Sequence, residues 1–194
     1  MLKKFKFSSI LLLTGILFLS FSLKNERYTQ TDYGPAIEWA PSVKLEWSDF
    51  KAKEKTTPGF AVATSTCGFG LESVTIDGKT AHKIFVRFYC DESWRNSNVD
   101  IQAVLDHEQL HFDICEIYGR KLYKELLKLK KSGKLNNDKA ETIYNNMMNA
   151  YNDYQDLYDY ETDHSTNGKK QQEWNEKVKR ELASLQMYSD YKNF

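Results

Sequence analysis

The stretch IQAVLDHEQLHFDICEIYGRKLYKEL, residues 101–126, has the pattern of a long amphipathic helix. Its apolar side chains recur every three or four positions, as they do when one face of a helix packs against a core. They are Ile101, Val104, Leu105, Phe112, Cys115, Tyr118, Leu122 and Leu126. A capping-box-like pair, Ser97 and Asp100, predicts that the helix begins near Ser97. Ser132-Gly133 predicts its end.

Strand patterns precede this helix, and two further helical patterns follow it. Residues 60–90 contain apolar side chains at alternate positions, and Asp77-Gly78 is typical of the two-residue turn of a β-hairpin. Helical periodicity returns over residues 138–158 and again from Lys169. Strands followed by helices are typical of α+β proteins. The predicted fold is therefore α+β, a small antiparallel sheet followed by three helices.

The N-terminus has the pattern of an export signal. Basic residues come first, and residues 10–23 are then almost wholly apolar. A run of this length is typical of a secretory signal and is short for a membrane span. We therefore predict a signal peptide or signal-anchor over residues 1–23, a linker or irregular arm over 24–42, and one domain over 43–194. Export predicts a secreted, periplasmic or cell-envelope protein.

The charge balance excludes one class of partner. The whole chain has 27 basic and 27 acidic residues. Without Lys3, Lys4 and Lys6 of the predicted signal, 24 basic residues remain against the same 27 acidic ones. A mildly acidic chain has no basic excess to attract nucleic acid. Membrane contact is expected only through an uncleaved N-terminal segment.

Three cysteines limit the redox chemistry and the metal chemistry. Cys67 and Cys90 fall in the predicted hairpin, and a disulfide between them is one hypothesis for an exported chain. Cys115 would then remain unpaired. No Cys-x-x-Cys pair is present, so the spacing excludes a zinc site built only from cysteines.

The candidate chemistry lies inside the long helix. His107 and His111 are four residues apart, so on a helix their imidazoles lie on one face and can bind one metal ion. Zinc accepts imidazole nitrogen, and its catalytic sites use three protein ligands and a water. Glu108, rotated by about 100° from His107, can act as general base toward that water. An exposed helix with two histidines is the alternative, but Glu108 lies beside the apolar stripe, where an uncompensated carboxylate is costly.

The third ligand has to come from outside this helical turn. The extended metalloprotease pattern needs glycine and histidine where this chain has Ile114 and Ile117, so that class is excluded. The polar break after the second helix offers His164, and Glu161 and Asp163 beside it are the alternatives. A ligand supplied by a later helix end would suit a packed pair of helices.

Several segments together resemble a bacterial family of predicted secreted zinc-dependent proteases, classed as a domain of unknown function, DUF922. The segments are residues 105–114 (LDHEQLHFDI), residues 45–50 (LEWSDF), Ser93-Trp94, and residues 161–164 (ETDH) with Gln172 and Trp174. The resemblance spans residues 43 to 185 and implies a zincin-like fold, Zn²⁺ as cofactor and His164 as third ligand. This chain has Ser165 where the family has glycine.

The predicted function is a zinc metallopeptidase acting on a peptide or protein substrate, with Glu108 as catalytic base and His107, His111 and His164 as ligands. The strand over residues 81–90 is the candidate for holding an extended substrate. Two alternatives remain open: a non-catalytic envelope protein with a structural metal, and a zinc amidase acting on cell-wall or small amide substrates.

Overall fold

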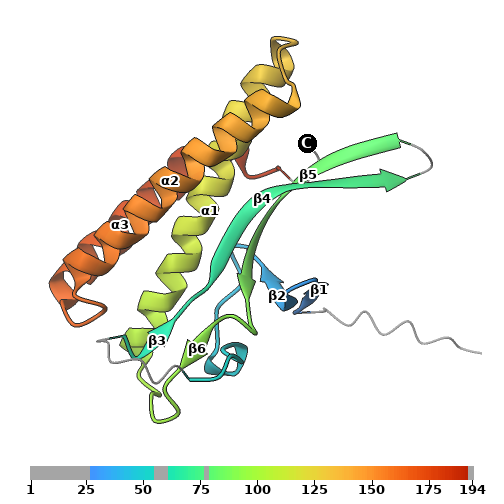
Figure 1. The fold of residues 1–194 in the computed structure, drawn as a ribbon. Coiled ribbons are helices and arrows are strands. Elements are labelled where there is room, and N and C mark those ends of the chain that lie inside the picture. Colours follow the sequence, from blue (N-terminus) through green and yellow to red (C-terminus); the bar gives the residue numbers. More distant parts are fainter. Residues whose placement is uncertain (1–26, 55–60, 77–78, 192–194) are drawn as a thin grey trace, which may run out of the picture.

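The computed structural model describes residues 27–54, 61–76 and 79–191. The fold is α+β, as predicted, with an antiparallel sheet and three long helices (Figure 1). The strands are β1 (Thr29–Thr31), β2 (Gly34–Glu38), β3 (Ala63–Thr64), β4 (Cys67–Ile76), β5 (Lys79–Tyr89) and β6 (Trp94–Arg95). The helices are α1 (Gln102–Lys131), α2 (Asn137–Thr162) and α3 (Gly168–Ser184), with short 3-10 turns η1 (Trp47–Asp49) and η2 (Gln186–Tyr188).

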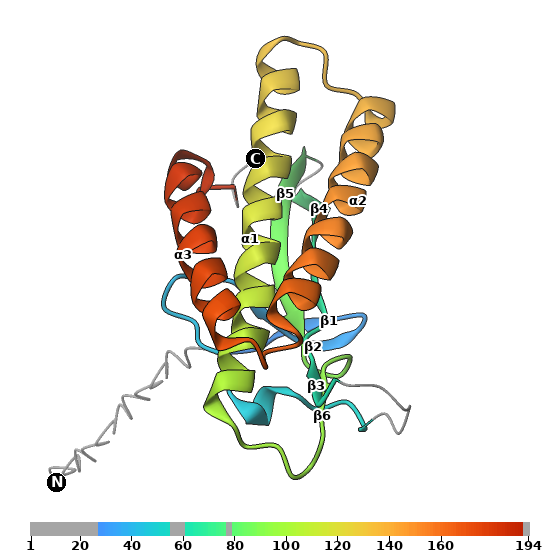
Figure 2. The same cartoon turned by 90° about the vertical axis from the view of Figure 1, so that its left-hand side faces the viewer.

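The main sheet has the strand order β1-β2-β5-β4, and every neighbouring pair is antiparallel. The predicted hairpin is confirmed, because β4 pairs with β5 along its whole length, from Cys67 opposite Phe88 to Ile76 opposite Lys79. A separate two-stranded sheet joins β3 to β6. All three helices lie on one side of the main sheet, with α1 flanked by α2 and α3 (Figure 2).

Within the segment predicted as a linker, residues 24–42, the structure has two strands of the main sheet, β1 and β2. β1 and β2 make a hairpin whose turn ends at Gly34, where φ is +87°, and Ile37 pairs with Phe88 of β5. Ala36 and Ile37 are buried, so they belong to the core. The strands are short and contain a Gly-Pro pair, which hides their alternation in the sequence. The predicted signal over residues 1–23 lies outside the described residues.

The first helix begins later than predicted. Its N-cap is Ile101, which has no capping side chain, and Ile101 is exposed rather than on the buried stripe. Val99 explains the delay, because its buried side chain packs with Ala63 and Val104 and holds the preceding chain against the small sheet. The predicted end is confirmed, since Ser132 is the C-cap and Gly133 has φ +65°.

α1 is the central element of the core. It packs against β4 and β5 on one side and against α2 and α3 on the other (Figure 1). Gly119 allows the closest approach, because a Cβ atom there would lie 2.3 Å from Cγ2 of Val86 on β5. The described cysteines are free thiols, so the predicted Cys67–Cys90 disulfide is not formed in this structure. Within the described ranges, no helix has the length and apolar character needed to cross a bilayer.

The close approach of α1 to the sheet predicts the effect of one methyl group. Gly119→Ala should destabilise the protein by about 1–3 kcal/mol through overpacking, although alanine favours helix by about 1 kcal/mol. Gly168→Ala is the matched control, because a Cβ there meets nothing within 4 Å. Urea denaturation should show a lower midpoint for Gly119→Ala only. Equal midpoints for the two variants would contradict this packing.

Candidate metal centre

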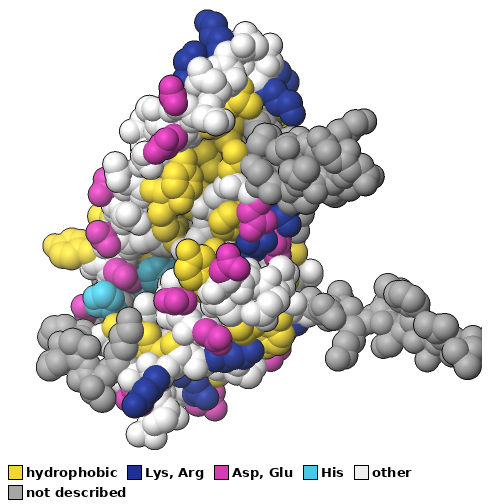
Figure 3. Space-filling model, turned by 45° about the vertical axis from the view of Figure 1, so that its right-hand side comes forward, with side chains coloured by type: hydrophobic (Ala, Val, Ile, Leu, Met, Phe, Trp, Pro, Cys, Tyr) yellow, Lys and Arg dark blue, Asp and Glu magenta, His cyan; other side chains and the backbone are white. Residues whose placement is uncertain are grey.

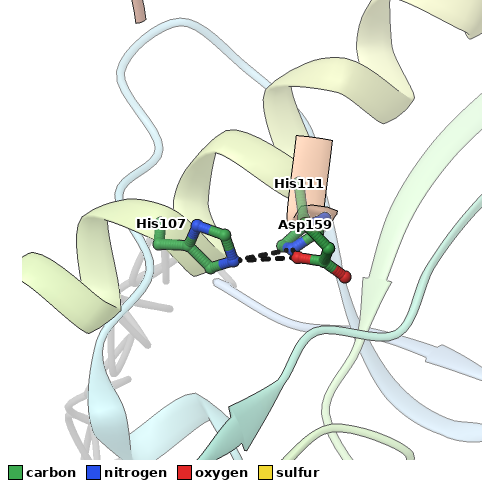
Figure 4. Close-up of side chains that lie close together, drawn as sticks. All are labelled: His107, His111 and Asp159. Atoms are coloured by element: carbon green, nitrogen blue, oxygen red, sulfur yellow. Dashed lines mark hydrogen bonds and ion pairs between the residues drawn. The ribbon is translucent and has the colours of Figure 1, made fainter. Parts of the chain in front are cut away.

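Three possible ligand atoms converge between α1 and α2. The Nε2 atoms of His107 and His111 lie 3.1 Å apart, one helical turn from each other on α1 (Figure 4). Oδ1 of Asp159, from the last turns of α2, lies 3.1 Å from Nε2 of His107 and 3.0 Å from Nε2 of His111. These three atoms form a group that could hold a metal ion. The structure therefore brings the two predicted histidines together.

The spacing of the three atoms fits a small divalent ion. Two donors of a tetrahedral zinc ion, each bonded at about 2.0–2.1 Å, lie roughly 3.3 Å apart. The observed separations of 3.0 to 3.1 Å are close to this value. Two imidazoles and one carboxylate are also a usual set for a catalytic zinc site with an open position.

Both histidines are oriented by glutamine side chains. Nδ1 of His107 lies 3.0 Å from Oε1 of Gln171 on α3, and Nδ1 of His111 lies 2.7 Å from Oε1 of Gln155 on α2. An amide oxygen can only accept a hydrogen bond, so each Nδ1 has to carry the proton. In the neutral rings Nε2 then has the lone pair, and Nε2 is the atom that faces Asp159. The glutamines therefore select the tautomer that a metal requires.

Tyr158 holds this network in place from within the core. Its ring is fully buried and stacks on His107 with a centroid distance of 4.6 Å. Its hydroxyl donates to Oε1 of Gln171 at 2.9 Å and lies 3.2 Å from the carbonyl oxygen of His107. One tyrosine of α2 thus fixes both a histidine of α1 and the glutamine of α3 that supports it.

The electrostatics of the site favour a cation. Burial lowers the pKa of His111. Hydrogen bonding to Asp159 and the charges of Glu108 and Asp159 outweigh this effect and raise the pKa to about 8. Burial raises the pKa of Asp159, yet hydrogen bonds from the protonated forms of His107 and His111, together with their charge, bring it well below its usual range. The carboxylate is therefore ionised and strongly attracts positive charge.

Glu108 faces the same cavity, which has a volume of about 330 Å³ and is also lined by the three candidate ligands. The Glu108 side chain is 4% exposed, and its Oε2 atom has no hydrogen-bond partner among the described residues. A buried carboxylate oxygen without a partner is costly. A water or hydroxide held in the cavity by a metal ion would supply the missing partner.

One wall of the cavity is an extended segment, residues 61–67. Ser65 ties this segment to α1, because its hydroxyl donates to the carbonyl oxygen of Glu108 at 3.3 Å. The strand predicted to hold substrate, residues 81–90, corresponds to β5, which lies between β2 and β4 in the main sheet and does not line this cavity. That prediction is wrong, because the sequence could not show which strand would lie inside the sheet.

His164, the predicted third ligand, lies beside the group rather than within it. Its Nδ1 atom is 3.7 Å from Oδ1 of Asp159, its side chain is 45% exposed, and it lines the cavity. The donor atoms that lie within 4.8 Å of one another come from His107, His111 and Asp159. Coordination by His164 therefore stays a prediction.

The other candidates for third ligand have partners elsewhere. Oε2 of Glu161 accepts a hydrogen bond from Nε1 of Trp174 at 2.9 Å, and Oδ2 of Asp163 accepts one from Oγ1 of Thr166 at 2.5 Å. The structure does not bring either carboxylate into the metal group. The remaining histidine of the sequence, His82, has a side chain outside the described part of the chain.

Sequence reasoning missed Asp159 and the two glutamines. A signal was present, because Tyr151, Gln155, Tyr158 and Asp159 are spaced by four, three and one residues and share one side of a helix. Polar side chains on the buried side of α2 needed partners, and the buried histidines of α1 are those partners.

Comparison with known proteins adds one match. Residues 90–165 match the model of a family described as bacterial protein of unknown function, DUF922. The match confirms the family resemblance over less than half of the chain, and it contains His107, Glu108, His111 and Asp159. No curated protein and no solved structure matched.

The glutamine contacts predict a selective loss of metal affinity. Gln171→Met removes the acceptor at Nδ1 of His107 and should weaken binding of Zn²⁺ about 10–100-fold. A loss of this size is typical when a side chain that hydrogen-bonds to a metal ligand is replaced. Gln172→Met, at an exposed position of the same helix, is the control and should bind like the wild type. Competition with a chromophoric chelator measures both affinities. Equal affinities would show that the glutamine does not orient the histidine.

Proposed function

We propose that this chain is a zinc-dependent hydrolase and that its reaction is the cleavage of peptide bonds. One observation carries the proposal: Glu108, whose Oε2 atom has no hydrogen-bond partner among the described residues, lines the same cavity as His107, His111 and Asp159. A structural metal site needs no such carboxylate, because its coordination is closed by protein ligands alone. An unpaired acid beside an open metal site is what hydrolysis requires.

The bound ion would lower the pKa of a water molecule toward neutrality and polarise the carbonyl group of the substrate. His107, His111 and Asp159 would hold it there. Their buried rings and the supporting glutamines keep the donor atoms fixed, so little reorganisation is needed during the reaction.

Glu108 supplies the proton transfers. It follows His107 directly on α1, so its side chain enters the cavity beside the imidazoles without competing for the same position. As general base it would take a proton from the attacking water, and as general acid it would deliver that proton to the leaving nitrogen. Its burial keeps competing water away from the carboxylate.

The lining of the cavity favours a neutral substrate group. Its wall contains the small apolar side chains of Ala61, Val62, Ala63 and Val104. None of the lining residues that the structure describes is lysine or arginine, so no basic side chain there would help the metal ion to neutralise a phosphate or sulfate ester. A peptide or another amide meets these conditions, and the predicted export signal would place the substrate in the cell envelope or outside the cell.

The decisive variant changes only the proposed base. Glu108→Gln should retain one zinc ion per chain and lose roughly 10²–10⁴-fold in kcat, because the amide cannot accept the proton. Asp106→Asn, at an exposed position two residues earlier on α1, should keep the wild-type rate. The assay should compare quenched peptide libraries with amide-containing cell-wall fragments.

Metal removal separates this proposal from its alternatives. Chelation should abolish hydrolysis, added Zn²⁺ should restore it, and circular dichroism should show that the chain stays folded throughout. Unfolding on chelation, or full activity of Glu108→Gln, would instead support a structural metal. Cleavage of wall fragments without cleavage of peptides would make the protein an amidase.

A further inference from the structure

We propose that His164 is a positioning residue that orients Asp159 and is not itself a metal ligand. This inference rests on the proposed function, because it assumes that the site holds a divalent ion. It assigns the third ligand to Asp159 and gives each of the three ligands a supporting side chain outside the metal group.

The pattern of support is already complete for the two histidines. His107 is held through Nδ1 by Gln171 at 3.0 Å, and His111 is held through Nδ1 by Gln155 at 2.7 Å. Asp159 lies between the two imidazoles, and the further polar group near its Oδ1 atom is Nδ1 of His164, at 3.7 Å. His164 is thus the side chain outside the metal group that is placed to support Asp159, although it approaches the oxygen that faces the imidazoles, whereas each glutamine binds the ring nitrogen that faces away.

Burial separates His164 from the ligands. The side chains of His107 and His111 are 3% and 11% exposed, whereas that of His164 is 45% exposed. Among the residues that the structure describes, the polar partner of its ring is Asp159, and no second side chain fixes its tautomer. Histidines that bind metal normally have their other nitrogen held by a hydrogen bond.

The backbone fixes His164 to the ligand that it would support. The N–H group of His164 donates to the carbonyl oxygen of Asp159 itself at 3.1 Å, and Asn167 donates to the carbonyl oxygen of Thr162 at 2.8 Å. Any movement of this end of α2 therefore carries Asp159 and His164 together. The ring itself is 45% exposed, so solvent borders much of its surface.

The turn after α2 has an unusual backbone conformation, which holds the His164 ring near Asp159. Asp163, His164 and Ser165 have φ values of 48°, 47° and 79°, three consecutive residues in the left-handed region. Each non-glycine residue there costs about 1–2 kcal/mol, and such strain is retained where the surroundings enforce it, often at functional sites. Without the left-handed turn the chain would continue along α2 and carry His164 away from Asp159.

A positioning role also suits the chemistry of a carboxylate. Each carboxylate oxygen has two lone pairs, so Oδ1 can face a metal ion with one and accept a hydrogen bond from Nδ1–H of His164 with the other. At 3.7 Å the contact is longer than an N–H···O hydrogen bond, and the exposed ring has room to shorten it. The bond would hold Asp159 in one rotamer with Oδ1 toward the imidazoles.

If His164 is a positioning residue, a different set of replacements can substitute for it than if it is a metal ligand. A positioning residue needs an N–H group near the place of Nδ1, which the side-chain amide of asparagine supplies. A histidine ligand binds zinc through the lone pair of an imidazole nitrogen, which asparagine lacks. Asparagine also tolerates the left-handed backbone at φ 47°, so His164→Asn keeps the turn.

Titration of the metal-free protein with Zn²⁺ and Co²⁺ tests the assignment. We expect His164→Ala to bind one ion per chain about 10–100-fold more weakly, with the visible absorption of the Co²⁺ form unchanged in shape and intensity. His164→Asn should recover most of the affinity. Asp159→Ala should lose stoichiometric binding. Asp163→Asn, the control in the same turn, should match the wild type.

The outcomes separate this inference from the function on which it rests. If the wild type binds no divalent ion, the proposed function is wrong. If the wild type binds zinc but His164→Ala loses the ion or changes the Co²⁺ spectrum, His164 is a ligand and the inference alone is overturned. Failure of His164→Asn to recover affinity also overturns it. Circular dichroism of each metal-free variant confirms that it is folded.

Discussion

The structure depends on one constraint, the burial of α1 between the sheet and the other two helices. A helix buried on nearly all sides cannot leave its polar side chains to water, so each of them needs a partner inside the protein. The partners come from α1 itself, from α2 and α3, and from the segments that follow β2 and η2. The pairs are Asp113 with Trp39, Glu116 with Arg120 and Tyr191, His107 with Gln171, and His111 with Gln155.

Two carboxylates, Glu108 on α1 and Asp159 on α2, differ from these paired groups, and both lie at the candidate site. Glu108 is buried on the same helix and has an oxygen without a partner among the described residues. Oδ1 of Asp159 lies 3.1 Å and 3.0 Å from the Nε2 atoms of His107 and His111, so three possible metal-ligand atoms face one another. Both features lie at one cavity, open to the surface on the side where histidine side chains appear among acidic ones (Figure 3). A divalent cation would resolve both at once.

The sequence predicted those parts of the fold and site whose signals are local. The β4–β5 hairpin joins neighbouring segments of the chain, and the periodicity of α1 lies within one helix, as do His107, Glu108 and His111. Asp159 was missed because its place depends on how α2 docks on α1, and periodicity within one helix does not encode that register. The strands of residues 29–38 were missed because their alternation is too short to distinguish from an irregular arm.

The site and the core are therefore built from the same contacts. α1 supplies two imidazoles, α2 supplies Asp159 and Gln155, and α3 supplies Gln171, so no pair of helices completes the constellation without the third. Tyr158 shows the coupling most directly, since one fully buried ring contacts His107 and its hydroxyl reaches Gln171. The region that matches the family model ends at residue 165, before α3 begins. The support that α3 gives to His107 is thus a property of this chain that the family match alone would not reveal.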